Sequence, residues 1–204
     1  MENNTKFLQN YDHNFYNGKP LKFEVYICKD CTQKNKEYVK ENIRDKIPKE
    51  ITNLGYIDIS YNNFKIQVQT PIMVCPFGFN KDSNNITLQF TNYKTDAIMN
   101  SFYHFIQTFE YKLMENIGID EEDTDLYIPQ IRYDKKGKYD PNLLIKVPFK
   151  GNSYNVDIKK EDSSISVTNI FKFSKLKCDI YIDKIWKYND KYICKWKVDR
   201  ILII

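Results

Sequence analysis

The sequence contains few side chains that could perform acid–base or nucleophilic chemistry. It has only two histidines, His13 and His104. His13 lies in a polar amino-terminal stretch, and His104 lies beside the apolar face of a predicted helix, where a structural role is favoured. The sequence has no phosphate-binding glycine loop and no nucleophile elbow. We therefore expect a protein that is not an enzyme and that uses no cofactor.

Five cysteines could supply metal or redox chemistry. Cys28 and Cys31 form a CxxC pair, which occurs in zinc sites and in thioredoxin-type motifs. A structural zinc ion needs four ligands, whereas Cys75, Cys178 and Cys194 stand singly in apolar segments, as small core residues do. Zinc binding and redox chemistry remain alternatives, but the sequence predicts no metal site. The odd number of cysteines and the lack of a signal-peptide pattern predict a reducing compartment.

Two other features point away from ion binding and from membranes. The acidic run 120–125 lacks the spaced ligands and the glycine of a calcium loop, so it is expected to be a solvated loop. No apolar run approaches the roughly 20 residues that a membrane span needs. We therefore expect no metal and no membrane partner.

Basic and aromatic residues are interleaved in two segments, 132–139 and 187–197. Cations can follow backbone phosphates while flat rings stack on bases, and sequence-tolerant binding of single strands needs this combination. Nearly all the cations are lysines, which contact phosphate as point charges, so little sequence specificity is expected. The alternative is a solvated lysine-rich face, since a net charge of +4 does not by itself demand nucleic acid.

The elements that must position these residues begin with one long helix, predicted over 95–117. Thr95 can cap it and Gly118 can end it. Its apolar residues recur at helical spacing on one face: Ile98, Phe102, Phe105, Ile106, Phe109, Leu113 and Ile117. A shorter charged surface helix is predicted within 33–49.

A first hairpin is predicted between strands at 57–61 and 64–68, joined by a two-residue turn. This register pairs Ile59 with Ile66, so that apolar residues stand opposite apolar residues. The other face of the second strand then points polar side chains outward: Lys65, Gln67 and Gln69.

Two later hairpins follow from the same pattern. Phe149 is expected opposite Tyr154. In the last hairpin, a three-residue loop at 189–191 places Trp186 and Trp196 on one apolar face as core residues. The opposite face then holds Lys187, Lys195 and Lys197, with Asp183 opposite Lys197.

This set of elements predicts a β-rich α+β fold, in which many antiparallel strands form a barrel or sandwich and the helix covers one side. Residues 1–20 are expected to be a flexible polar arm, and residues 21–204 a single domain.

One segment carries a family resemblance. Residues 68–78 read VQTPIMVCPFG, which resembles the VQTPxMxxPFG signature of a family in large nucleocytoplasmic DNA viruses. That family is similar to the single-stranded-DNA-binding proteins of podophages, which have an OB fold. Tyr-Ile-Pro at 127–129, Tyr-Asp-Pro at 139–141 and a closing hairpin with tryptophan follow in the same order. The resemblance covers roughly residues 56–204.

The resemblance implies an OB-fold-like antiparallel barrel with one long core helix, about 95–117, and extra strands. It further implies a giant-virus protein that binds single-stranded DNA and protects exposed strands in viral DNA replication, recombination and repair, in the cytoplasm of the infected host cell. Replication proteins are candidate partners, and a homo-oligomer is possible but not indicated. The alternatives are a viral structural or protein–protein interaction module without nucleic-acid binding, and an enzyme accessory domain.

The expected DNA-binding residues come from the strand at 64–70, from the turn at 132–139, which we call the basic turn, from its neighbourhood, and from the last hairpin. They are Lys65, Gln67, Gln69, Arg132, Tyr133, Lys135, Lys136, Lys138, Tyr139, Lys146, Lys187, Lys195 and Lys197. The polar side of the 64–70 strand is expected to adjoin the basic turn.

Overall fold

The computed structural model describes residues 7–8, 26–27, 54–59, 66–161, 163–188 and 190–204 of the 204-residue chain. The strands are β1 (Phe7–Leu8), β2 (Tyr26–Ile27), β3 (Leu54–Asp58), β4 (Ile66–Gln69), β5 (Met73–Cys75), β6 (Asn85–Gln89), β7 (Ile131–Arg132), β8 (Asn142–Lys146), β9 (Phe149–Lys150), β10 (Ser153–Tyr154), β11 (Asp157–Lys160), β12 (Ser163–Ser164), β13 (Ser174–Ile182), β14 (Lys184–Tyr188), β15 (Lys191–Cys194) and β16 (Trp196–Ile203). The helices are α2 (Ala97–Asn116) and the short 3₁₀ helices η1 (Glu121–Leu126) and η2 (Val167–Asn169).

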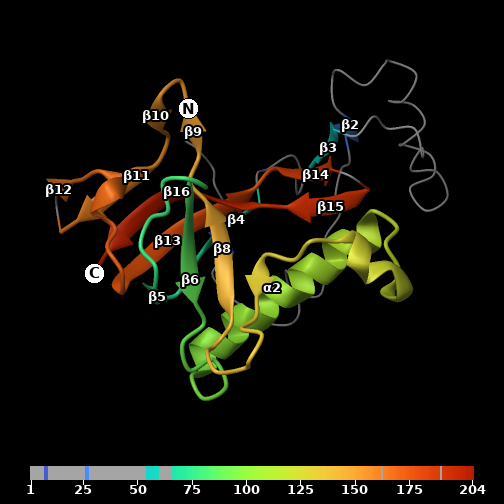
Figure 1. Ribbon diagram of the computed structural model, residues 1–204, viewed down its shortest axis with the longest axis horizontal. Coiled ribbons are helices and arrows are strands. Elements are labelled where there is room, and N and C mark those ends of the chain that lie inside the picture. The colour runs from blue at the N-terminus through green and yellow to red at the C-terminus, as the bar shows by residue number, and fades with distance from the viewer. Residues whose placement is uncertain (1–6, 9–25, 28–53, 60–65, 162, 189) are drawn as a thin grey trace.

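Five strands close into an OB-fold-like barrel (Figure 1). In chain order they are β5, β6, β8, β13 and β16. Around the barrel the order is β5, β6, β8, β16, β13 and back to β5. Every contact is antiparallel except that of β8 with β16, which is parallel. The predicted barrel with one long helix and extra strands is therefore confirmed, and the barrel is mixed because of this one parallel pair.

The barrel interior is filled by alternate residues of its strands. Ile86 and Leu88 of β6 are buried beside Leu143 and Ile145 of β8, while the residues between them are only partly covered. This alternation is what a strand with one face in the core requires. The alternation of Ile86, Leu88 and Phe90 in the sequence marks this strand by itself.

The long helix begins one residue later than expected. Asp96, not Thr95, is the N-cap, and its carboxylate accepts hydrogen bonds from the backbone N–H groups of Ile98 and Met99 at 2.9 and 3.0 Å. A carboxylate there also complements the positive end of the helix dipole, which explains why it is preferred over the threonine hydroxyl. The helix then runs over Ala97–Asn116, as the periodicity predicts.

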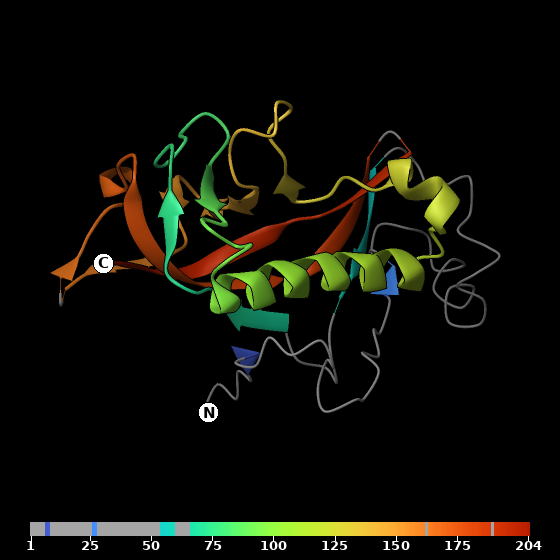
Figure 2. The same cartoon turned by 90° about the horizontal axis from the view of Figure 1, so that it is seen from below.

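The helix lies between β6 and β8 in the chain and packs against the barrel (Figure 2). Its Phe109 ring lies 5.4 Å from the Trp196 ring of β16, and Phe102 lies 5.9 Å from Phe90. The predicted apolar face is buried except for Ile98, which is 64% exposed because it lies in the first turn, at the end of the face.

The first predicted hairpin is wrong. Strand β3 pairs with β14 and β2, so Ile57 stands opposite Ile185 and Ile27. Strand β4 pairs instead with β13 and, in parallel, with β1. Ile59, Ile66 and Val68 are buried as the alternation predicts, but both strands pair with other partners in the fold.

The register of the last hairpin is also wrong. Tyr188 pairs with Lys191 across a two-residue loop, and this sets Trp186 beside Ile193. Trp186 is consequently half-buried rather than a core residue, whereas Trp196 is only 1% exposed, as predicted. The apolar residues from 178 to 202 need not share one face, because β13 and β16 belong to the barrel while β14 and β15 join β3 in a second sheet.

The pairing of Phe149 with Tyr154 is confirmed, but that hairpin is short. Beyond it, Ile158 belongs to β11, which pairs in parallel with β16. The predicted helix within 33–49, His13, Cys28, Cys31 and most of the polar arm lie outside the described residues.

The two tryptophans should differ in their contribution to stability. Replacing Trp196 by alanine removes a buried ring that contacts Phe109, so we expect the free energy of unfolding to fall by about 3–5 kcal/mol. Trp186→Ala should cost less, roughly 1–2 kcal/mol, because the ring is half-buried. Urea unfolding of both variants measures this. Equal losses would contradict the two-residue loop.

Candidate nucleic-acid interface

The outer face of β6 and β8 is polar. In β6 the half-buried residues Asn85, Thr87 and Gln89 point away from the core, since Ile86 and Leu88 between them are buried. Their cross-strand partners in β8 are Lys146, Leu144 and Asn142, respectively. The second and third strands of OB-fold barrels and the loops beside them are the usual binding surface of this architecture.

A loop, a lysine and three aromatic rings bound one end of this face. The 76–84 loop joins β5 to β6, and its Ser83 carbonyl accepts a 2.7 Å hydrogen bond from the Lys146 ammonium. Tyr154 donates its hydroxyl proton to the Asn84 side-chain oxygen at 3.0 Å.

The Tyr154 ring is the centre of a short aromatic row at this end. The Phe79 ring lies 5.1 Å from it edge-on, and the Phe149 ring lies 4.9 Å from it. Phe149 is 49% exposed, so the row ends in a ring face that solvent reaches. Sequence analysis predicted the contact of Phe149 with Tyr154 but not its place beside the outer face, because the path of the 76–84 loop was not predictable.

Two lysines from different elements meet at the same end. Lys146 ends β8, and Lys195 precedes β16, whose first residues pair with the end of β8. Partial burial and the nearby charge of Lys195 both lower the pKa of Lys146. Like charges this close create a local positive potential, which a bound phosphate would relieve.

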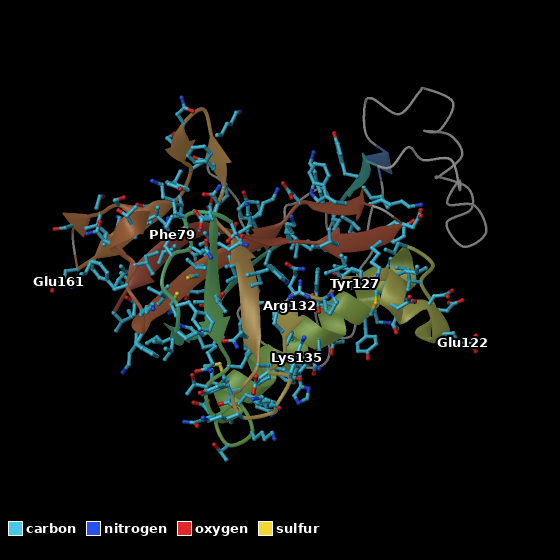
Figure 3. The ribbon with its side chains drawn as sticks, in the orientation of Figure 1. Phe79, Glu122, Tyr127, Arg132, Lys135 and Glu161 are labelled. Atoms are coloured by element: carbon cyan, nitrogen blue, oxygen red, sulfur yellow. The ribbon has the colours of Figure 1, made fainter. Side chains whose placement is uncertain are left out.

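The basic turn lies at the other end of the face, between β7 and β8. Figure 3 shows Lys135 and Phe79 toward opposite ends of the β6–β8 pair. Asp134 shapes the turn: its carbonyl accepts from the Gly137 N–H at 3.0 Å, and its carboxylate accepts from the Lys138 N–H at 2.8 Å. Gly137 has a φ of 64°, which glycine adopts without strain. The side chains of Lys135, Lys136 and Lys138 are all exposed.

Two tyrosines flank the turn with exposed rings. Tyr133 and Tyr139 are 58% and 59% exposed. Tyr133 is fixed to α2, because its hydroxyl lies 2.8 Å from the Tyr103 hydroxyl and accepts a 3.2 Å hydrogen bond from the Gln107 amide. The Lys138 ammonium lies 5.2 Å from the centre of the Tyr139 ring. The turn therefore offers two ring faces and three ammonium groups on a hydrogen-bonded frame.

A buried carboxyl on α2 holds the segment that leads into the turn. Glu110 accepts a 2.6 Å hydrogen bond from the Gln130 backbone N–H, and the Gln130 carbonyl accepts from the Leu144 N–H of β8. Burial raises the pKa of Glu110 to about 7, although the Gln130 N–H and the charge of Arg132 act in the opposite direction. Arg132 itself is exposed, and Figure 3 shows it near α2.

The lysines of the last hairpin are not equivalent. Lys197 donates to both carboxylate oxygens of Asp183 at 2.7 Å, but it stands opposite Tyr181 and not opposite Asp183, as the predicted register had it. The Lys187 side chain is only 14% exposed and lies 3.6 Å from Asp190. Lys195 alone among the three is exposed, so it is the one best placed to meet a ligand.

The strand at 64–70 does not join this interface, and the expectation that it adjoins the basic turn is wrong. Gln67 is only 4% exposed, because β4 lies inside the sheet between β1 and β13 and is covered on both faces. Gln69 is half-buried and donates a 2.8 Å hydrogen bond to Asp179. Strands β13 and β16 separate β4 from β8, and Lys65 lies outside the described residues.

The described residues form no arrangement suited to the metal or redox chemistry that the sequence left as alternatives. Nowhere in them do three or more His, Cys, Asp or Glu side chains group as potential metal ligands. Cys75, Cys178 and Cys194 are free and buried, and burial raises the pKa of each thiol, as expected of core residues. Among the helices of that part of the chain, none is both long and apolar enough to cross a membrane.

Comparison with known proteins identifies no family for this chain. The sequence matches no protein-family model, and a search of curated proteins finds no match.

The pKa of Glu110 generates a prediction about stability and pH. Its folded pKa of about 7 exceeds the ordinary value of 4.5, so the folded state holds an extra proton between these values. Stability should therefore fall as pH rises from 4.5 to 7. In Glu110→Gln, which keeps the oxygen that accepts from Gln130, this fall should disappear, a difference of roughly 2–3 kcal/mol between pH 5 and pH 8.

Urea unfolding at pH 5 and pH 8 measures that difference, with Glu122→Gln as the control because Glu122 is exposed. If wild type and Glu110→Gln lose the same stability between the two pH values, then Glu110 does not titrate near neutrality.

Proposed function

We propose that this protein binds single-stranded DNA with little sequence preference, along the outer face of β6 and β8. The observation that carries the proposal is the composition of this face. It is mostly polar, with Leu144 at its middle, and it has cations and exposed rings at both ends: half-buried Lys146, exposed Lys195 and Phe149 at one, and the basic turn at the other.

The types of side chain match a single strand better than a duplex. Exposed rings at both ends can stack on unpaired bases, which a duplex does not present. The exposed cations of the basic turn and of Lys195 are ammonium groups, which meet phosphates as point charges without reading base edges. Asn85, Thr87 and Gln89 add side-chain hydrogen-bonding groups between the two ends.

The resemblance of residues 68–78 to the viral family extends the proposal to a role. A protein of this kind would cover strands exposed in viral DNA replication, recombination and repair, at the site of replication in the host cytoplasm, and would meet replication proteins there. The first test is binding of labelled oligodeoxythymidine, measured by fluorescence anisotropy against salt. Affinity should fall steeply as salt rises, through counterion release, and duplex of equal length should bind more weakly.

The competing function is a protein–protein interaction module that uses the same surface. It predicts no binding of oligonucleotides even at low salt. An affinity that does not change with salt would also contradict the proposal, because several ammonium–phosphate contacts cannot form without releasing counterions.

Replacing Lys135, Lys136 and Lys138 together by alanine should weaken binding equally for all sequences. Each lost phosphate contact lowers the salt slope by roughly 0.7 on single strands, so the slope should fall by up to about 2. The matched control replaces Lys112, Lys159 and Lys160, which are also exposed but lie on α2 and β11. The control should keep the wild-type slope, and equal effects of both triple variants would mean that only net charge matters.

Replacing Tyr133 and Tyr139 by alanine should weaken binding without changing the salt slope, because stacking releases no counterions. The loss should be about 1–3 kcal/mol per stacked base. Tyr133→Phe is the control for the ring: it removes the hydroxyl contact with Tyr103 but keeps the stacking surface. A slope that falls as much as in the triple lysine variant would contradict a stacking role.

A further inference from the structure

Three phenylalanines outside the β6–β8 face expose most of their surface to solvent. Phe77, in the 76–84 loop, is 64% exposed, and Phe171 and Phe173, in the 170–173 loop before β13, are 67% and 72% exposed. These three residues form what we call the phenylalanine patch. Grouped exposed rings of this size usually mark a binding surface.

The two loops are locked together, so the patch has a defined shape. Phe79 N–H donates to the Ile170 carbonyl at 3.1 Å, and Phe173 N–H donates to the Cys75 carbonyl at 2.8 Å. Gly78 fits between them with a φ of 70°, and a Cβ atom there would approach the Ile170 oxygen to 2.8 Å. The backbones that carry Phe77 and Phe171 are therefore direct neighbours.

The backbone at Phe173 indicates that its ring is not there for folding. Its φ is 65°, a left-handed conformation that is unfavourable for a bulky residue and favours glycine or asparagine. The side chain gains almost no burial in return, since 72% of the residue is exposed. A residue that strains the backbone without packing in the core is a candidate for function.

The charges among the rings identify the class of ligand. Lys172 lies between Phe171 and Phe173, Lys175 follows, and both are exposed. The stretch 170–177 reads IFKFSKLK and contains no acidic residue. Cations alternating with rings complement phosphates alternating with bases, whereas a purely apolar partner would leave these ammonium groups without a counter-charge.

The 76–84 loop links the phenylalanine patch to the β6–β8 face. The 76–84 loop carries Phe77 near its start and, at its end, Ser83, whose carbonyl binds Lys146. Between them, Phe79 contacts the ring of Tyr154, at the end of the outer face. A strand that leaves this face beyond Lys146 would therefore meet the phenylalanine patch next.

We infer that the phenylalanine patch, with Lys172 and Lys175, is a second stacking segment that holds further bases of the same single strand beyond the β6–β8 face. This inference rests on the proposed function and extends it: the binding site is longer than the outer face of the barrel, and its two parts are filled in turn as the strand lengthens.

The test is a length series of oligodeoxythymidine, from about 6 to about 20 nucleotides, with wild type and a variant in which Phe77, Phe171 and Phe173 are all leucine. Leucine keeps an apolar side chain but has no ring face. The variant should match wild type on the shortest oligonucleotides and bind the longest about tenfold more weakly or worse. Tyr111→Leu, an exposed ring on α2, is the control and should match wild type at every length.

The outcomes separate this inference from the proposed function. If wild type binds no oligonucleotide, the proposed function fails. If wild type binds but the leucine variant matches it at every length, or loses affinity equally at every length, the second segment is refuted. The inference is also refuted if wild type sediments as an oligomer that the leucine substitutions dissociate, since the patch would then join copies of the chain.

A second variant checks the backbone argument independently of binding. Phe173→Gly removes the ring and relieves the left-handed strain, so it should melt no lower than wild type and yet lose affinity for the long oligonucleotides. A lower melting temperature would mean that Phe173 serves the fold, and would overturn the assignment of its ring to the ligand.

Discussion

Strands β8 and β16, from distant parts of the chain, lie side by side in parallel, with Trp196 opposite Ile145 and Lys197 opposite Lys146. This contact closes the barrel, because β8 continues through β6 to β5 while β16 continues through β13 to the same β5. It buries Trp196 in the core and brings Lys195 close enough to lower the pKa of Lys146. Closure of the core and the concentration of positive charge at one end of the outer face are therefore consequences of the same pairing.

Helix α2, which lies between β6 and β8 in the chain, orients the basic turn at the other end of the outer face. One side of α2 packs into the core, and groups at the edge of that side reach the segment before β8. Glu110 accepts the Gln130 N–H, and Tyr103 contacts the Tyr133 hydroxyl. A loop connected only by its ends would leave the basic turn without a fixed orientation. These two contacts orient it through a rigid element, so that little ordering of the turn would be left for the proposed ligand to induce.

The positions of the lysines distinguish this protein more than its net charge does. A net charge of +4 is modest, and some lysines are already matched, as Lys197 is by Asp183. The cations of the basic turn and Lys195 are exposed, and they lie at the two ends of a polar face. A lysine held by a carboxylate must give up that contact to meet a phosphate, so exposed lysines contribute more to attraction of a strand than their number suggests. The same holds for rings: the exposed ones cluster beside cations, whereas the buried ones, such as Phe109 and Phe102, build the core.

Local periodicity alone determined the long helix and the strand around Ile86 and Leu88, because each of these elements buries a face that its own sequence marks. It also determined that Tyr154 stands opposite Phe149, since a short loop leaves little choice of register. The basic turn, with its exposed lysines and tyrosines, was also predictable from its local sequence. The pairings of β3 and β4, the register of β14 with β15 and the burial of Gln67 were decided only by the tertiary structure. A period of two residues shows which face of a strand is apolar but not which strand pairs with its edge, and only the tertiary structure sets β4 beside β13, which pairs with β5 through its first residues and with β4 through its last.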